Sequence, residues 1–226
     1  MRRLTIANFT TSQSAMDLVY SYSALLIAYL VGSLSFAVIV SRAMGLNDPR
    51  TYGSKNPGAT NVLRSGSKAA AVVTLVLDAA KGWLPVALVQ WVGQQYGLGE
   101  GTMAMTGLAA FVGHLYPVFF RFVGGKGVAT ALGVLLGISP LLGLAVAVTW
   151  LAMAWFFRYS SLASLTAAVA APICYVLADG QAWYLDKSVL LSLSVMSLLL
   201  IYRHAENIGR LARGTESRLG GKKAKP

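Results

Sequence analysis

Three short polar stretches of the chain carry residue types that bind anions. The first covers residues 52–66 and reads YGSKNPGATNVLRSG. Gly, Pro and Asn divide it into turns, and several of its side chains offer hydrogen bonds or positive charge. These side chains are Ser54, Lys55, Asn56, Thr60, Asn61 and Arg64. The alternative interpretation is a polar loop whose Asn and Ser side chains cap the following helix.

The second stretch, residues 113–130, reads GHLYPVFFRFVGGKGVAT and contains a glycine-rich turn. Gly124, Gly125 and Gly127 let consecutive backbone N–H groups face one point, Lys126 adds a full charge, and a helix is expected to follow. That combination is typical of an anion cradle. The spacing of a Walker A loop is absent, so nucleotide hydrolysis is not indicated. A flexible turn between two helices is the alternative.

The third stretch, residues 203–216, reads RHAENIGRLARGTE and holds one of only two histidines in the chain. If a helix continues through it, His204, Asn207 and Arg210 lie near one face, since they are three residues apart. Glu206 and Glu216 are the nearby carboxylates. The alternative is a basic tail that contacts acidic lipid, with Glu206 and Arg210 as an ordinary ion pair.

Other polar residues have simpler interpretations. Asp78 and Lys81 lie in an apolar stretch three residues apart, which favours a structural ion pair, with support of a nearby site as the alternative. Ser160 or Ser161 is suited to cap the helix that follows Arg158. Cys174 is read as a small apolar filler, and no cluster of metal ligands is seen, so we expect neither a metal nor a cofactor.

The elements that must position these residues are helices in a membrane. The 226 residues are 56% hydrophobic and 12% charged, with a mean hydropathy of +0.61. A soluble globular domain has about 25% charged residues, so this composition excludes that class. The high hydrophobicity excludes a disordered chain, and the single cysteine excludes a module held together by disulfides. The net charge of +11 is assigned to the cytoplasmic membrane face and to phosphorylated substrates rather than to nucleic acid.

Seven stretches qualify as membrane spans, and they predict one all-α domain over residues 1–226. The expected spans are 18–41, 69–92, 102–120, 127–138, 141–157, 159–178 and 188–202. The fourth and fifth spans come from 31 consecutive uncharged residues, 127–157, which we divide at Ser139-Pro140 because proline cannot continue a helix.

The distribution of Lys and Arg supports seven spans with the N-terminus outside and the C-terminus in the cytoplasm. In this topology the inner segments hold 15 basic residues, in 42–68, 121–126, at position 158 and in 203–226. The outer segments hold Arg2, Arg3 and Lys187. The Arg2-Arg3 pair opposes the rule, and no signal-peptide core follows it, because residues 5–14 are mostly polar. All three polar stretches then face the cytoplasm.

With these motifs in order, the chain resembles the bacterial acyl-phosphate-dependent glycerol-3-phosphate acyltransferases, the PlsY family. The resemblance rests on GSKNPGATNVLR from Gly53, GHLYPVFFRFVGGKGVAT from Gly113 and HAENIGRLARGTE from His204. It extends to LDAAKG from Leu77 and to Ser161 after an Arg-Tyr pair. The family usually has Phe-Lys before the Gly-Gly-Lys-Gly turn, whereas this chain has Phe122-Val123 and so lacks one cation.

The resemblance implies a multi-pass protein of the bacterial inner membrane whose active site faces the cytoplasm. It implies acyl transfer from acyl phosphate to the 1-hydroxyl of glycerol 3-phosphate, the first acylation step of bacterial phospholipid synthesis, with lysophosphatidic acid and phosphate as products. The expected partners are the two substrates, membrane lipid and an enzyme that supplies acyl phosphate.

Roles for the site residues follow from the same resemblance. Lys126 with its glycines, and Arg64 with Ser54, are assigned to phosphate binding, and His204 and Asn207 to positioning the glycerol phosphate or the reacting carbonyl. Ser161 and His114 support the site, and Glu216 orients Arg or Asn partners. The remaining substrate-binding candidates are Asn56, Thr60, Asn61, Gly124, Gly125, Gly127 and Arg210.

The sequence also bears on the general base. The histidine–aspartate dyad of another large acyltransferase class is absent, because Val118 and Ile208 stand four residues after the two histidines. We therefore expect a substrate phosphate to accept the hydroxyl proton while the protein supplies orientation and charge, with His204 as the alternative base.

Three rival functions remain open at this point. Basic loops and an intramembrane ion pair also suit an organic-phosphate transporter, although no second copy of any motif is seen. A phosphatidyltransferase of the CDP-alcohol type needs clustered aspartates, and those of this chain are scattered. A purely structural membrane protein is the third.

Overall fold

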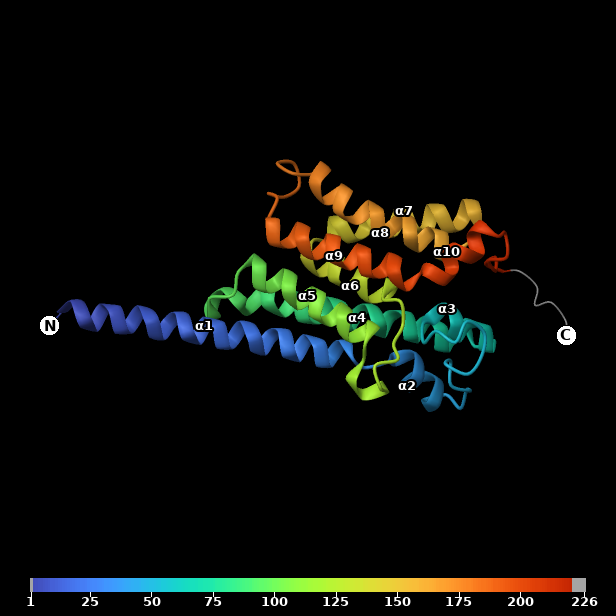
Figure 1. Ribbon diagram of the computed structural model, residues 1–226, viewed down its shortest axis with the longest axis horizontal. Helices are drawn as coiled ribbons and strands as arrows, with labels where there is room; N and C mark the ends of the chain where they lie inside the picture. Colours follow the sequence, from blue (N-terminus) through green and yellow to red (C-terminus); the bar gives the residue numbers. More distant parts are fainter. Residues whose placement is uncertain (1, 221–226) are drawn as a thin grey trace.

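The computed structural model describes residues 2–220, and side chains from residue 16 onward, as a bundle of helices lying side by side (Figure 1). The long helices are α1 (Arg2–Gly32), α4 (Lys68–Val92), α5 (Glu100–Leu115), α7 (Pro140–Phe157), α8 (Ser160–Leu177) and α9 (Lys187–Arg203). The shorter ones are α2 (Phe36–Ala43), α3 (Ala59–Val62), α6 (Val128–Ile138) and α10 (Ala205–Ala212). Three 3₁₀ turns complete the set: η1 (Leu63–Ser65), η2 (Gly93–Tyr96) and η3 (Val118–Phe120). Within the described residues there is no β-strand, which agrees with the all-α prediction.

Length and apolarity make several helices capable of crossing a bilayer. Four qualify singly: α4 with η2, α5 with η3, α7 and α8. The bent pairs α1–α2 and α9–α10 raise the number to six. α6 is apolar but has 11 residues, about 16 Å at 1.5 Å per residue, which is short for a hydrocarbon core of about 30 Å. Each of the seven predicted spans therefore contains a helix, while the count of seven crossings stays a prediction.

The break at Ser139-Pro140 lies where the sequence indicates it. Ser139 ends α6 and caps α7, and its hydroxyl accepts a hydrogen bond from the Leu142 amide. Pro140 occupies the first position of α7, where its missing N–H costs nothing.

The first span differs from the single helix expected over residues 18–41. α1 begins at Arg2 and ends at Gly32, and after a three-residue break α2 leaves at an angle of 42°. A side chain at Gly32 would meet the backbone of Ala110 in α5, so α1 packs closely there. The Ser33 hydroxyl donates to the Tyr29 carbonyl, and Lys81 donates to the carbonyl of Leu34 inside the break. These tertiary contacts, rather than a proline, accompany the bend.

The core runs between the long helices and consists of apolar side chains from α4 to α9. Fully buried residues include Val86, Phe111, Leu115, Leu142 and Leu193. A smaller cluster around Val62 and Ala70 joins α2, α3 and the start of α4. This second cluster fixes the first polar stretch on the end of the bundle. In Figure 1, α3 and α10 lie together at the end opposite the N-terminus.

Candidate active site

Asn61 organises the first polar stretch from within. It is 2% exposed, and its Nδ2 donates to the carbonyls of Pro49 (2.7 Å) and Tyr52 (3.2 Å). Its Oδ1 accepts from the Ser54 amide (3.1 Å) and from Arg64 Nη1 (3.5 Å). Asn61 therefore folds the loop around itself and brings Ser54 and Arg64 to the same side. The capping alternative is wrong for α4, because Ser67 caps that helix.

Two other candidates of this stretch have looser surroundings. Asn56 is half-buried and Thr60 is exposed. Among the residues that the structure describes, neither side chain makes a hydrogen bond to another predicted site residue. Both lie in the loop that also carries Ser54 and Arg64, and no contact within the described residues assigns them a role.

The glycine-rich turn is held from both sides. The Gly125 amide donates to the His114 carbonyl (3.1 Å), so the prediction that this N–H faces an anion is wrong. A side chain at Gly125 would meet the His114 ring. On the other side Arg203 donates to the carbonyls of Gly124 (2.9 Å) and Gly125 (3.2 Å). Gly127 has φ +83°, in the left-handed region that favours glycine, and it ends the turn where α6 begins. The sequence-based interpretation gave no role to Arg203, although it is the first residue of the third polar stretch.

Lys126 points from this turn to the third polar stretch, where it donates to Asn207 Oδ1. Burial, together with the nearby charge of Arg210, lowers the pKa of Lys126 to about 8. The turn is thus joined to the C-terminal stretch by a lysine that is charged at neutral pH. A nearby anion would stabilise this charged form.

Glu216 accepts hydrogen bonds from side chains of the third stretch and of α8. Its Oε1 accepts from Ser161 Oγ (2.7 Å) and from Asn207 Nδ2 (2.7 Å), and its Oε2 accepts from Arg210 Nε (2.7 Å). Burial raises the pKa of Glu216, but these three hydrogen bonds more than offset that effect, and the net shift is downward. The predicted role of Glu216 in orienting Asn and Arg partners agrees with this geometry.

The Ser161 hydroxyl donates its hydrogen bond to the Glu216 carboxylate and does not cap α8. No side-chain capping bond is found at the start of that helix. The backbone around it is also tied to the tail, because the Leu219 amide donates to the Arg158 carbonyl (2.6 Å). Arg64 completes the connection between stretches, since its Nη2 donates to Ser217 Oγ (2.9 Å).

His204 lies at the junction of the last two helices. The chain bends by 57° between α9 and α10, so the third stretch is not the straight continuation that was expected. The His204 ring is 3% exposed, and its Nδ1 lies 2.8 Å from the Leu200 carbonyl. Because a carbonyl only accepts, Nδ1 carries the proton and Nε2 is left unprotonated. Burial lowers the pKa of His204 to about 4, which keeps the ring neutral at physiological pH.

The basic tail extends beyond these contacts. The Glu206–Arg210 pair is present at 3.6 Å on the outer side of α10. Lys222, Lys223 and Lys225, which contribute to the predicted cytoplasmic charge, lie outside the described residues. Within residues 2–220 no group of three or more His, Cys, Asp or Glu side chains is arranged to hold a metal ion.

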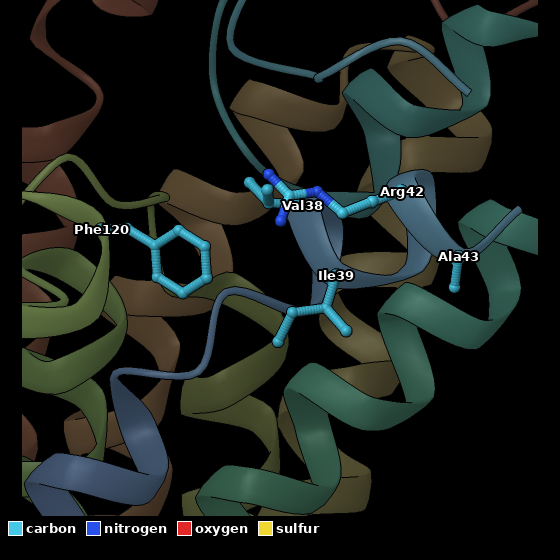
Figure 2. A pocket seen from close by; sticks show the side chains of 5 residues that line it. All are labelled: Val38, Ile39, Arg42, Ala43 and Phe120. Atoms are coloured by element: carbon cyan, nitrogen blue, oxygen red, sulfur yellow. The ribbon is translucent and has the colours of Figure 1, made fainter. Parts of the chain in front are cut away.

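An apolar groove opens beside the second polar stretch. It has a volume of about 330 Å³ and lies between α2 and η3, lined by Val38, Ile39, Arg42, Ala43 and Phe120. Figure 2 shows the Phe120 ring facing α2 and the Arg42 side chain crossing the other edge. Arg50, from the loop before the first polar stretch, lies 5.8 Å from the centre of the Phe120 ring. The groove therefore adjoins the second polar stretch through Phe120.

These features define a class: a multi-pass helical membrane protein with a cluster of cationic and amide side chains at one end of its bundle. Comparison with known proteins identifies the family. The family described as Glycerol-3-phosphate acyltransferase matches residues 22–214. The Glycerol-3-phosphate acyltransferase of Albidiferax ferrireducens is 74% identical over 92% of this chain and 93% of its own. That of Bordetella petrii is 57% identical over 93% and 99%.

Solved structures agree with the sequence relatives. The crystal structure of PlsY (YgiH), an integral membrane glycerol 3-phosphate acyltransferase in its glycerol 3-phosphate form, superposes with a TM-score of 0.80. It is 41% identical and covers 89% of this chain and 96% of its own. Its lysophosphatidic acid form gives a TM-score of 0.79. The chain belongs to the glycerol-3-phosphate acyltransferase family, and the enzymatic acylation of glycerol 3-phosphate is the activity that this membership supports.

Proposed function

We propose that the protein transfers a fatty acyl group from acyl phosphate to the 1-hydroxyl of sn-glycerol 3-phosphate. The products are lysophosphatidic acid and inorganic phosphate. The observation that carries the proposal is that three cationic side chains are held by hydrogen bonds to the C-terminal stretch. Arg64 donates to Ser217, Lys126 to Asn207 and Arg210 to Glu216. Both substrates bring phosphate, and cations with fixed hydrogen-bonding neighbours bind phosphate through charge-assisted bonds.

The related crystal structures support the choice of acceptor and product. They are described as a glycerol 3-phosphate form and a lysophosphatidic acid form of that protein. For the donor, the apolar groove beside η3 offers a place for the first part of an acyl chain, and Arg42 lies on its edge. A long-chain donor with a phosphate head suits a site in which cations and apolar surface adjoin.

The chemical step needs no group beyond the two substrates and this chain. The 1-hydroxyl oxygen attacks the acyl carbonyl carbon, the bond from that carbon to the phosphate oxygen breaks, and phosphate leaves with the electron pair. A phosphate oxygen accepts the hydroxyl proton. His204 is the weaker proton acceptor, because its pKa is about 4 and the second pKa of a phosphate ester is about 6. Lys126 and Arg64 stabilise the charge that develops on phosphate.

Single-turnover kinetics separate this mechanism from histidine catalysis. His204→Gln keeps a hydrogen-bonding side chain, so we expect weaker binding and slower transfer but measurable product at saturating substrate. Complete loss of single-turnover transfer, in a variant that is folded and binds glycerol 3-phosphate, would assign the base to His204.

The test of the function uses the full-length protein purified in detergent. Given acyl phosphate and radiolabelled glycerol 3-phosphate, without acyl-CoA or acyl carrier protein, it should form labelled lysophosphatidic acid. Acylation that occurs only with acyl-CoA would show a different donor. Movement of the label across proteoliposomes without esterification would show the organic-phosphate transporter instead.

We further propose seven crossings, with the N-terminus outside and the site in the cytoplasm of a bacterial inner membrane. In this arrangement α6 is a short span within the bundle, and Tyr184 and Arg213 lie on opposite sides. The test places single cysteines, Tyr184→Cys or Arg213→Cys, in a Cys174→Ser background. A membrane-impermeant maleimide added to spheroplasts should label position 184 and leave position 213 unlabelled until the membrane is opened. The reverse pattern would contradict the orientation.

A further inference from the structure

A charged pair lies deep in the bundle, one helix away from the site. Asp78 and Lys81 on α4 are 2% and 3% exposed, and their side chains approach to 2.8 Å. Lys81 also donates to the Leu34 carbonyl at 2.6 Å and lies 5.6 Å from the centre of the Phe36 ring. Lys81 thus connects Asp78 to the break between α1 and α2, where the helix leaves carbonyls without their usual partners.

Asp78 has a second neighbour, which belongs to the site. Its Oδ1, the same oxygen that pairs with Lys81, lies 3.6 Å from His114 Nδ1, just beyond hydrogen-bonding distance. The His114 ring is buried, and its Nε2 faces the position where a side chain on Gly125 would stand. The imidazole therefore lies between the carboxylate of Asp78 and the glycine-rich turn.

A contribution to the stability of the fold does not by itself explain why a charged pair is buried here. Two charges within an apolar bundle carry a desolvation penalty, and well-packed apolar residues of the same volume are often as stable or more so. The pair does provide a fixed acceptor beside Nδ1 of His114. Such an acceptor selects the tautomer and the ring orientation of a histidine.

We propose that Asp78 is a positioning residue for the Gly124–Gly127 turn. Asp78 orients the His114 imidazole, the imidazole sets the backbone of Gly125, and the turn presents Lys126 to the phosphate of glycerol 3-phosphate. Lys81 compensates the buried charge of Asp78, so it is not required when an uncharged acceptor stands at position 78. The inference rests on the proposed function for the identity of the ligand.

Two double variants that leave no unpaired charge test the proposal. Asp78→Leu/Lys81→Met removes the acceptor beside His114, and Asp78→Asn/Lys81→Met keeps an acceptor of nearly the same shape. We expect the leucine variant to raise KM for glycerol 3-phosphate about 10-fold with kcat changed less than about 3-fold, because a small displacement of a binding group weakens productive binding. The asparagine variant should return KM to within about 2-fold of the wild type. Thr106→Val, a buried substitution on the same helix as His114, is the control and should leave KM unchanged.

The outcomes separate positioning from a structural role. If the pair has only a structural role, both double variants have the same KM, whatever their melting temperatures. That result would overturn the proposal. If the leucine variant does not fold, Asp78→Glu serves instead, because it keeps the charge and pushes the carboxylate toward His114. A wild-type KM in Asp78→Glu would then overturn the proposal.

A second readout keeps the inference distinct from the proposed function. Thermal stabilisation of the purified variants by glycerol 3-phosphate measures binding without acyl transfer. If the wild type binds glycerol 3-phosphate but does not acylate it from acyl phosphate, the proposed donor is wrong, while the difference in affinity between the two double variants still decides the positioning role. Equal stabilisation of both double variants would contradict that role.

Discussion

The charge of Lys126 makes a quantitative prediction about pH. Its pKa is lowered to about 8 because burial and Arg210 disfavour the ammonium form, so the side chain loses its proton as pH rises through 8. At that pKa, about nine-tenths of the lysine is charged at pH 7 and about one-tenth at pH 9. If only the charged form binds phosphate, kcat/KM for glycerol 3-phosphate falls about 10-fold over this range.

Other groups in the site do not produce this change. His204 is neutral throughout, since its pKa is about 4. The phosphate of glycerol 3-phosphate, with a second pKa of about 6, is a dianion across the range. The dependence of kcat/KM on pH therefore reports the free enzyme and its lysine.

The assay compares the wild type with Lys126→Arg at several pH values between 7 and 9. Arginine stays charged throughout this range, so the variant should show a flat profile even if its absolute activity is lower, because the guanidinium has a different shape. An equal fall of kcat/KM in both proteins, or a flat profile in the wild type, would refute the assignment of this pKa and of the phosphate contact.

Three further predictions use single substitutions. Glu216→Gln replaces one acceptor by a donor that faces another donor, so it should destabilise the protein by about 1.5–3 kcal/mol, measured by thermal unfolding in detergent; an unchanged melting temperature would contradict the three-donor arrangement. Gly125→Ala collides with the His114 ring and should lower kcat/KM about 100-fold, whereas Gly99→Ala, which has open space around it, should lie within about 2-fold of the wild type. Ile39→Trp fills the groove of Figure 2 and should lower activity with long-chain acyl phosphates more than with short-chain ones. An equal loss with both would show that the acyl chain binds elsewhere. Ala170→Trp, in a groove on α8, is the control.

The helices were largely predictable because hydrophobic length and proline are local signals. Each expected apolar segment contains a helix, and Ser139-Pro140 divides the long uncharged stretch as expected. The break after Gly32 was not predictable, since no proline or charge marks it and its reasons are tertiary: the contact with Ala110 and the bond from Lys81 to Leu34. The bend at His204 is likewise unmarked in the sequence.

The site was predictable as a set of segments but not as a set of contacts. Residue type and spacing singled out Lys126, Asn207 and Glu216, which the structure joins. They did not show that Asn61 is the centre of its loop rather than a surface ligand. Nor did they indicate Arg203, because an arginine at the end of a span is expected for topology alone.

A structure of this protein with glycerol 3-phosphate bound would locate the phosphate site. We expect the phosphate to lie within hydrogen-bonding distance of Lys126 and Arg64, with Glu216 still held by Ser161 and Arg210. A phosphate bound in the groove beside Arg42, with Lys126 still bonded only to Asn207, would contradict this expectation.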